Sequence, residues 1–156
     1  MSSMPNVTLE WQRFEQFSAA ALYELLGFRQ AIFVVEQCSP YPDLDGLDRS
    51  AWHLLLRDAG ELAGCLRLAP SPSLRIGRVA VASRLRRQGF GRRLIDHAMS
   101  FCRDRYPGQP VRLAAQLALA RFYERFGFSP VSQPYDDFGV MHVEMSAEAE
   151  PLKSGF

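Results

Sequence analysis

The segment 86–91 (RRQGFG) constrains this chain more than any other part of its sequence. It follows an apolar run at 74–81 that is typical of a buried strand, and it precedes an amphipathic stretch that predicts a helix ending near Arg105. Gly89 and Gly91 let the backbone come close to a ligand, and the first N–H groups of a helix point outward without partners. The segment therefore predicts a pyrophosphate cradle, the alternative being a tight turn with solvated arginines.

Basic residues are concentrated around this segment. Seven arginines lie within 19 positions that hold no acidic residue, namely Arg75, Arg78, Arg84, Arg86, Arg87, Arg92 and Arg93. The formal net charge is only +1, which argues against a protein built wholly to bind nucleic acid. Apart from Phe90, the stretch also lacks the interleaved aromatic residues of an RNA-binding surface. We expect an anionic small ligand and no nucleic-acid partner.

Two other phosphate-binding motifs do not match. A dinucleotide fingerprint needs a third glycine where Leu94 stands, and an acidic residue about 20 positions further on, where neither Val111 nor its neighbours are acidic. A P-loop needs a Gly-Lys-Ser/Thr run, and the only lysine in the chain is Lys153.

The rest of the chain predicts one domain of mixed α/β type. At 156 residues, with 47% hydrophobic and 22% charged residues, it has the size and composition of a single globular domain. We place that domain at 7–148 and a frayed tail at 149–156. Hydrophobic patterning predicts strands at 7–11, 52–57, 61–68, 74–81, 111–115, 128–131 and 140–145, and helices at 19–36, from the glycine turn to about 105, and at 116–126.

The cysteine content and the apolar runs indicate a cytoplasmic protein. Cys38, Cys65 and Cys102 are odd in number and widely spaced, which fits reduced thiols. The longest purely apolar run, at 31–35, is far shorter than a membrane helix needs. The start of the chain does not have the pattern of a secretory signal. We therefore expect no membrane partner.

Two motifs, in the right order, carry a resemblance to a known family. The segment 86–91 is similar to the Arg/Gln-x-x-Gly-x-Gly/Ala loop of the GCN5-related N-acetyltransferases (GNAT). The segment 116–128 (QLALARFYERFGF) is similar to the Asn-x6-Tyr-x3-Gly-Phe helix of that family, with Gln116 in place of the usual Asn. Both motifs stand in the predicted context of strand, loop and helix.

Further segments narrow the resemblance to the ElaA-like branch of this superfamily. They are 33–37 (FVVEQ), 41–48 (YPDLDGLD) with His53, and 139–142 (GVMH). The likeness extends over 7–145, almost the whole chain.

The resemblance implies both a fold and an activity. The fold would be a mixed, mostly antiparallel sheet of six to seven strands flanked by about four helices. The activity would be direct transfer of an acetyl group from acetyl-CoA to a primary amine of a small molecule or a protein, without a metal. The implied acetyl-CoA-binding residues are Val79, Ala80, Val81, Arg86, Arg87, Gln88, Gly89, Phe90, Gly91, Arg92 and Gln116. In such an enzyme pantetheine lies along the strand at 79–81 like an added strand.

Tyr123 is the implied general acid. A phenol has a pKa near ~10 and a thiol near ~8.5, so a tyrosine can protonate a leaving thiolate at modest energetic expense. The alternative is a tyrosine that only packs on the apolar face of its helix. The Gly-Phe pair four residues further on favours the catalytic role.

The general base is open between Glu36, His142 and bulk water. The strand before the glycine turn carries no carboxylate at 77–80. In a regular helix Glu36 lies on the same face as Arg29, about 10.5 Å along the axis. Glu36 is therefore either functional or a structural partner of Arg29. His142 shares a strand face with Val140, where a neutral imidazole can accept a proton through water.

Three residues on the acceptor side are predicted to bind substrate: Arg29, Asp45 and His53. The loop around Asp45 is acidic and either attracts a cationic amine or forms a solvated turn. Its spacing does not fit a calcium loop, because the glycine falls at position four and Leu54 stands where the bidentate Glu belongs. The histidines are too scattered for a zinc site. We expect no metal.

Other functions stay open at this point. A non-catalytic acyl-CoA-binding module would need the same loop without a general base. Cys38 would carry the acetyl group in a ping-pong route. A fainter likeness, through Arg29 and 32–33, leads to the autoinducer synthases, which use longer acyl donors. The oligomeric state, including a homodimer, is also open.

Overall fold

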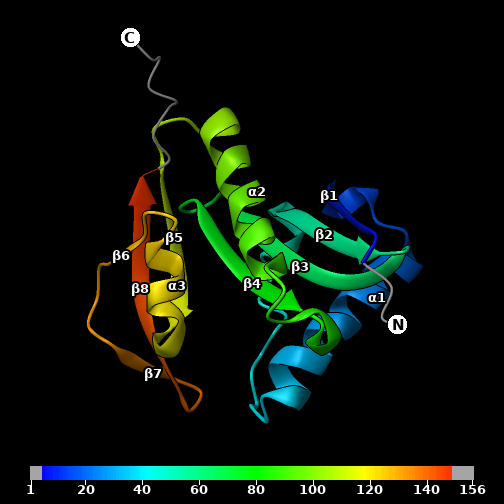
Figure 1. Ribbon diagram of the computed structural model, residues 1–156, viewed down its shortest axis with the longest axis horizontal. Helices are drawn as coiled ribbons and strands as arrows, with labels where there is room; N and C mark the ends of the chain where they lie inside the picture. Colours follow the sequence, from blue (N-terminus) through cyan, green and yellow to red (C-terminus); the bar gives the residue numbers. More distant parts are fainter. Residues whose placement is uncertain (1–4, 149–156) are drawn as a thin grey trace.

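In the computed structural model, which describes residues 5–148, eight strands form one sheet accompanied by three α-helices (Figure 1). The strands are β1 (Val7–Arg13), β2 (Trp52–Asp58), β3 (Glu61–Ala69), β4 (Arg75–Val81), β5 (Pro110–Gln116), β6 (Ser129–Pro130), β7 (Tyr135–Asp137) and β8 (Val140–Glu148). The α-helices are α1 (Ala19–Gln30), α2 (Phe90–Arg105) and α3 (Ala120–Glu124). The predicted tail at 149–156 lies outside the described residues.

The sheet has the order β1-β2-β3-β4-β5-β8-β6, and β7 pairs with β8. Every pair is antiparallel except β4 and β5, which confirms the predicted mixed sheet. The strand β7 is the additional one: its sequence, YDD, shows neither β-branched residues nor alternation, so patterning did not predict it. Within the described residues there are three α-helices instead of about four, because the other five helical segments are short 3-10 or π-helical turns.

Helices cover both faces of the sheet (Figure 1). Leu54 and Leu56 of β2 belong to the core beneath α2 and α3, whereas Leu55 between them packs in the smaller core beneath α1. This alternation is what a central strand buried on both faces requires. No helix among residues 5–148 is long and apolar enough to cross a membrane.

The N-terminal helix is shorter than predicted. It begins as expected at Ser18, whose Oγ accepts a hydrogen bond from the N–H of Ala21 at 3.1 Å. After Gln30 the chain continues as a π-helical turn, η2 (Ala31–Glu36). Each π turn takes up more residues than an α turn, so Glu36 rotates away from the face that carries Arg29. The alternative that Glu36 is a structural partner of Arg29 is therefore wrong: Arg29 pairs with Asp43 and Asp48, and Glu36 pairs with Arg86.

The centre of the sheet opens at β4. Strands β4 and β5 pair in register only at Arg75 and Arg112 and then diverge, as Figure 1 shows. On its other side β4 pairs with β3, but the register shifts between Cys65 and Arg67, where β4 contains an extra residue. This bulge includes Arg78, which adopts a left-handed φ of 51°.

Gly64 keeps β3 close to its neighbours. A Cβ atom at this position would lie 3.1 Å from Leu56 Cβ and 3.2 Å from the carbonyl oxygen of Ala80. We expect Gly64→Ala to lower the free energy of unfolding by about 1–3 kcal/mol, because neither neighbour can move without displacing a strand. Gly27→Ala in α1, where a Cβ meets no atom within 4 Å, should raise it by about 0.5–1 kcal/mol. Urea denaturation of both variants measures the difference, and equal values would contradict the packing argument.

Candidate active site

A cavity of about 350 Å³ lies where β4 and β5 diverge. Residues of β4 and β5 line it from both sides, and η2, the loop near Tyr41 and the β7–β8 hairpin complete its walls. Of the predicted catalytic residues, Glu36, Tyr123 and His142 all line this cavity. Three segments that are distant in the sequence thus bring the candidate acid and both candidate bases into one cleft of ligand-binding size.

The wall formed by β4 can receive an extended chain. Val79, Ala80 and Val81 line the cavity on the side from which β5 has diverged. A strand edge without a partner presents alternating N–H and C=O groups, which pair with any extended molecule that carries amides. The predicted pantetheine-binding strand therefore has the backbone edge that this role needs.

The glycine turn forms the N-terminus of the long helix α2. Gly89 is its N-cap, with a left-handed φ of 85°, and no side chain caps the helix. The first helical bond runs from the N–H of Arg93 to the carbonyl of Gly89 at 3.1 Å, so the N–H groups at 90–92 precede it. Those groups and the helix dipole favour an anion. The side chain of Phe90 is buried in the core and anchors the turn.

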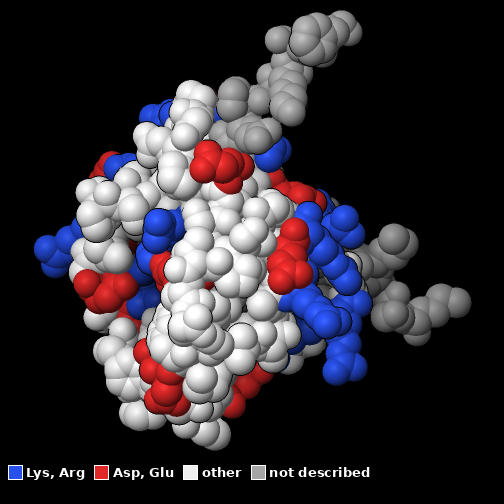
Figure 2. All heavy atoms as spheres, turned by 90° about the vertical axis from the view of Figure 1, so that its left-hand side faces the viewer, with Lys and Arg blue, Asp and Glu red and all other residues white. Residues whose placement is uncertain are grey.

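Among residues 5–148, four of the seven arginines of the predicted basic patch form ion pairs, so that three carry unpaired positive charge. Four of the seven pair with carboxylates: Arg75 with Glu144, Arg78 with Asp43, Arg84 with Asp58, and Arg86 with Glu36. Among the described residues no carboxylate pairs with Arg87, Arg92 or Arg93, which are exposed around the start of α2. Figure 2 shows basic side chains gathered along one edge of the molecule, beside a largely uncharged band. The unpaired positive charge therefore lies where an anion would meet the helix.

Tyr123 faces the cavity from α3. Its side chain is 8% exposed, and the rings of Phe122 and Phe128 pack edge-on against it. Burial raises the pKa of Tyr123 to about 12, so the hydroxyl stays protonated at neutral pH. Gly127 has the predicted left-handed φ, 92°, but the helix before it is shorter than the predicted 116–126: Gln116 ends β5, 117–119 is a 3-10 turn, and α3 spans only Ala120–Glu124. The position is that of a neutral proton donor.

His142 lies opposite on β8, in register with Gln116 of β5. Its Nδ1 is 2.8 Å from the carbonyl oxygen of Val140. A carbonyl only accepts hydrogen bonds, so this contact requires a proton on Nδ1 and leaves Nε2 of the neutral ring with a free lone pair. The ring also stacks on Tyr135, with centroids 6.1 Å apart. The ring of His142 is thus held by Val140 and Tyr135, and the contact with Val140 does not use Nε2.

Glu36 is engaged in a different interaction. Both of its carboxylate oxygens accept hydrogen bonds from the guanidinium of Arg86, one of them at 3.0 Å. The Nε of Arg86 in turn donates to the carbonyl of Val81 at 2.9 Å. These hydrogen bonds lower the pKa of Glu36, which weakens it as a base. Of the two predicted bases, the geometry favours His142.

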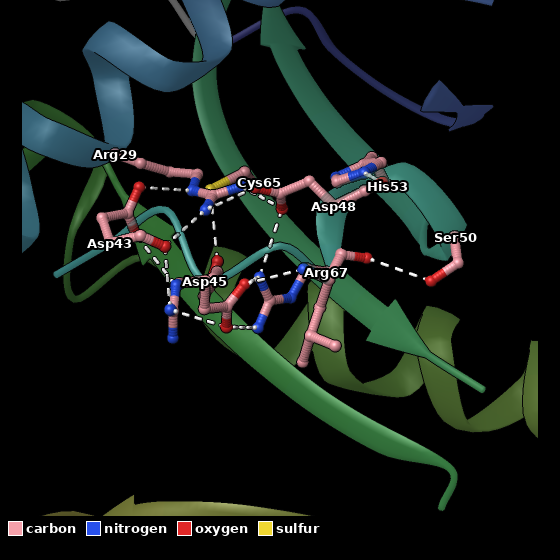
Figure 3. A network of polar contacts seen from close by, with 10 residues as sticks. Arg29, Asp43, Asp45, Asp48, Ser50, His53, Cys65 and Arg67 are labelled. Carbon is pink, nitrogen blue, oxygen red and sulfur yellow. Dashed lines mark hydrogen bonds and ion pairs between the residues drawn. The ribbon is translucent and has the colours of Figure 1, made fainter. Parts of the chain in front are cut away.

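Beneath the cleft, a buried network joins the loop 43–48 to the sheet (Figure 3). Arg29 of α1, only 1% exposed, donates from Nε to Asp43 at 3.0 Å and from Nη1 to Asp48 at 2.7 Å. Arg67 of β3 contacts Asp48 at 3.2 Å and Asp45 at 2.8 Å. The sequence showed three aspartates in the loop, but their partners come from three separate elements, and patterning did not identify them.

This network also fixes the bulge of β4. The Nε of Arg78 is 2.8 Å from Asp43 Oδ1, and its Nη2 donates to the carbonyl of Asp43 at 2.9 Å. Its guanidinium also lies over the ring of Tyr41, 4.8 Å from the centroid. A left-handed φ at a residue other than glycine persists where its surroundings hold it in place. The bulge that shapes the cavity wall is therefore held by the loop.

The three predicted substrate-binding residues lie in or beside this network instead of in the cavity wall. Arg29, Asp45 and His53 are not among the residues that line the cavity. His53, 2% exposed, places Nε2 2.9 Å from the carbonyl oxygen of Asp48, and burial lowers its pKa. The acidic loop is neither the solvated turn nor the free anionic surface that the sequence left open, because arginines neutralise it.

The comparisons with known proteins cover the same residues. A model of the acetyltransferase (GNAT) domain matches residues 33–149. Protein ElaA of Escherichia coli is 38% identical over 148 residues, which cover 90% of this chain and 97% of ElaA, and its crystal structure superposes with a TM-score of 0.84. A UPF0039 protein of Synechocystis is 38% identical over 94% of this chain and 98% of its own length. The structure of an acyl-CoA N-acyltransferase from Pseudomonas aeruginosa, 32% identical, superposes with a TM-score of 0.86 over 91% of this chain and 99% of that chain.

The acidic loop gives stability a defined pH dependence. Burial alone would raise the pKa of Asp45, but hydrogen bonds from Arg67 and from the N–H of Leu47 lower it to about 2, from 3.8. Because the folded pKa is the lower one, the stabilising contribution is complete above pH ~4 and disappears as the pH falls toward 2.

We expect Asp45→Asn to lower the free energy of unfolding by about 1–3 kcal/mol at pH 7, with the gap to wild type closing between pH 4 and 2. Chemical denaturation at a series of pH values measures it. Asp104→Asn, at an exposed position of α2, is the control and should keep a small, constant offset. A gap for Asp45→Asn that stays constant down to pH 2 would contradict the assignment.

Proposed function

The chain belongs to the GNAT acetyltransferase family, as an ElaA-like member, and from that premise we propose that it transfers an acetyl group from acetyl-CoA directly to a primary amine. It is an acyltransferase that uses a CoA-linked acyl donor. One observation carries the finer proposal: the cavity between β4 and β5, lined by Val81 and Arg86 just before the uncapped N-terminus of α2, holds a buried tyrosine and a histidine whose Nδ1 contacts a backbone carbonyl.

Donor binding follows from the backbone of this chain. The pantetheine amides would pair with the open edge of β4 at Val79–Val81. The diphosphate would take hydrogen bonds from the N–H groups of the glycine turn, with Arg87 and Arg92 adding positive charge. Gln116 lines the same cavity at the end of β5, so its side-chain amide can reach a bound donor.

The chemistry needs two proton transfers, and the cleft holds one group for each. The ammonium of the acceptor loses a proton to Nε2 of His142, which passes it to solvent. The amine nitrogen then attacks the thioester carbon, forming the C–N bond, while β4 N–H groups face the developing oxyanion. As the C–S bond breaks, Tyr123 protonates the thiolate, and the second proton of the nitrogen restores the phenol through water.

Other assignments fit the cleft less well. Cys38 is exposed and does not line the cavity, so a covalent acetyl-cysteine has no place in the proposed transfer. A non-catalytic acyl-CoA-binding module would not need His142 oriented toward the cleft. We also assign the protein to the cytoplasm, since Cys38, Cys65 and Cys102 are all free thiols. The single domain at 7–148 is part of the same proposal.

The assignment of Tyr123 is tested by thiol release from acetyl-CoA across a panel of primary amines. We expect Tyr123→Phe to lower kcat at least tenfold, because the leaving thiolate loses its proton donor, while calorimetry finds acetyl-CoA affinity nearly unchanged. Tyr23→Phe, at a position 83% exposed, should behave as wild type. Equal turnover in Tyr123→Phe would remove the proton-donor role.

The role of His142 predicts a loss that depends on pH. We expect His142→Gln to lower kcat about 10–100-fold at pH 7, and less as the pH rises, because solvent then supplies the unprotonated amine without a base. His97→Gln, at an exposed site on α2, is the matched control. Turnover is measured from pH 6 to 10, and a loss that does not depend on pH would argue for a structural role of His142.

A further inference from the structure

The positively charged residues that line the cleft all have carboxylate partners. Four arginines line it, and each is paired with a carboxylate, as described above for Arg75, Arg78 and Arg86. The fourth, Arg67, pairs with Asp45 and Asp48. An acceptor that carries a carboxylate would therefore have to displace an existing ion pair to reach a positive charge.

Asp137 is the exception among the charged residues of the lining. It is half-buried at the end of β7 and is one of the residues that line the cavity. Within residues 5–148 no arginine, lysine or histidine forms an ion pair with it, and no donor hydrogen-bonds its carboxylate. The free charge at this end of the cleft is therefore negative.

The hairpin places Asp137 and His142 on one face. The register pairs Tyr135 with His142 and Asp137 with Val140. Residues two apart on a strand share a face, so the carboxylate and the imidazole are diagonal neighbours, about 7–8 Å apart between their Cα atoms in such pairs. An ammonium held by Asp137 would lie next to the free Nε2 of His142.

The segment 33–41 supplies aromatic side chains to the lining of the cavity and contacts the β7–β8 hairpin. Phe33 and Tyr41 line the cavity there. The Tyr41 ring meets Phe138 edge-on at a centroid distance of 5.8 Å, and the hydroxyl of Ser39 lies 3.4 Å from the carbonyl of Phe138. Burial raises the pKa of Tyr41, and the charge of Asp137 contributes to that shift, as expected for groups that share one small space. The cavity therefore suits a small molecule with an apolar body.

We propose that Asp137 anchors the ammonium group of the acceptor, and that the acceptor is a small primary amine with an apolar or aromatic body and no carboxylate. This inference rests on the proposed acetyl transfer and specifies its substrate class. Asp137 attracts the ammonium before its proton passes to His142, and it repels an acceptor carboxylate. The residue acts in binding and takes no proton in the transfer.

The test uses three probes that share one aromatic body. Phenethylamine is a primary amine without further charge, phenylalanine adds a carboxylate, and phenylalaninamide keeps the added size without the negative charge. For wild type we expect kcat/KM to be at least tenfold higher for phenethylamine and phenylalaninamide than for phenylalanine. Discrimination that followed size instead of charge would overturn the proposal.

The variant Asp137→Asn keeps the shape and removes the charge. We expect it to raise KM for phenethylamine at least tenfold, to change kcat and the KM for acetyl-CoA less than threefold, and to reduce discrimination against phenylalanine. Asp136→Asn makes the same change of charge one residue earlier, on the other face of β7, and should behave as wild type. Equal effects of the two substitutions, or an effect of Asp137→Asn on kcat alone, would contradict the anchoring role.

A second measurement separates this inference from the proposed transfer. Calorimetric titration of phenethylamine into protein saturated with CoA measures acceptor binding without chemistry. Binding by wild type that weakens at least tenfold in Asp137→Asn would support the anchor even if no thiol is released, in which case only the transfer function fails. Binding that is absent from wild type, or equal in the two proteins, would overturn the anchor whatever the activity.

Discussion

The divergence of β4 and β5 is the constraint on which the rest of this molecule depends. A parallel pair held in register at one point, Arg75 with Arg112, leaves most of β4 with an open edge inside the protein instead of at its rim. An open edge in a core is costly unless a ligand or water satisfies it. The core compensates by packing helices on both faces, so that the sheet remains one unit although its hydrogen bonding is interrupted at the middle.

Within the described part of the chain, the charged residues along the cleft are paired in its middle and unpaired at two places. Among residues 5–148, the exposed arginines near the start of α2 have no acidic partner, and Asp137 in the lining of the cavity has no basic partner. Between them the charges are paired, and the buried network of Arg29, Asp43 and Asp48 fixes the floor. Because buried pairs contribute little net stability, their value here is geometric: they hold the loop and the bulge in one arrangement.

The sequence predicted the elements that local patterning specifies. The glycine turn before α2 and the left-handed Gly127 follow from motifs and spacing, and Tyr123 and His142, which the sequence named as candidates, both line one cavity. The π-helical turn did not, because it depends on tertiary packing and its residues are as apolar as those of an α-helix. Likewise β7 and Asp137 are placed by the hairpin that pairs β7 with β8, which a short polar segment without alternation does not reveal. Assigning roles to the residues of the site therefore requires the strand pairing as well as the sequence motifs.

The extra residue in β4 inverts the parity of that strand. Ile76, before the bulge, packs in the core beneath α2, whereas Ala80, four positions later, packs beneath α1, although an unbroken pleat would send both to the same side. The alternation of side chains between the two faces of the sheet thus changes phase within this strand, at the bulge that includes Arg78. An insertion or deletion of one residue here would turn every side chain on one side of the bulge to the opposite face of the sheet, from the core beneath α1 to the core beneath α2 or the reverse. The length of this strand is therefore far less free to vary than its composition.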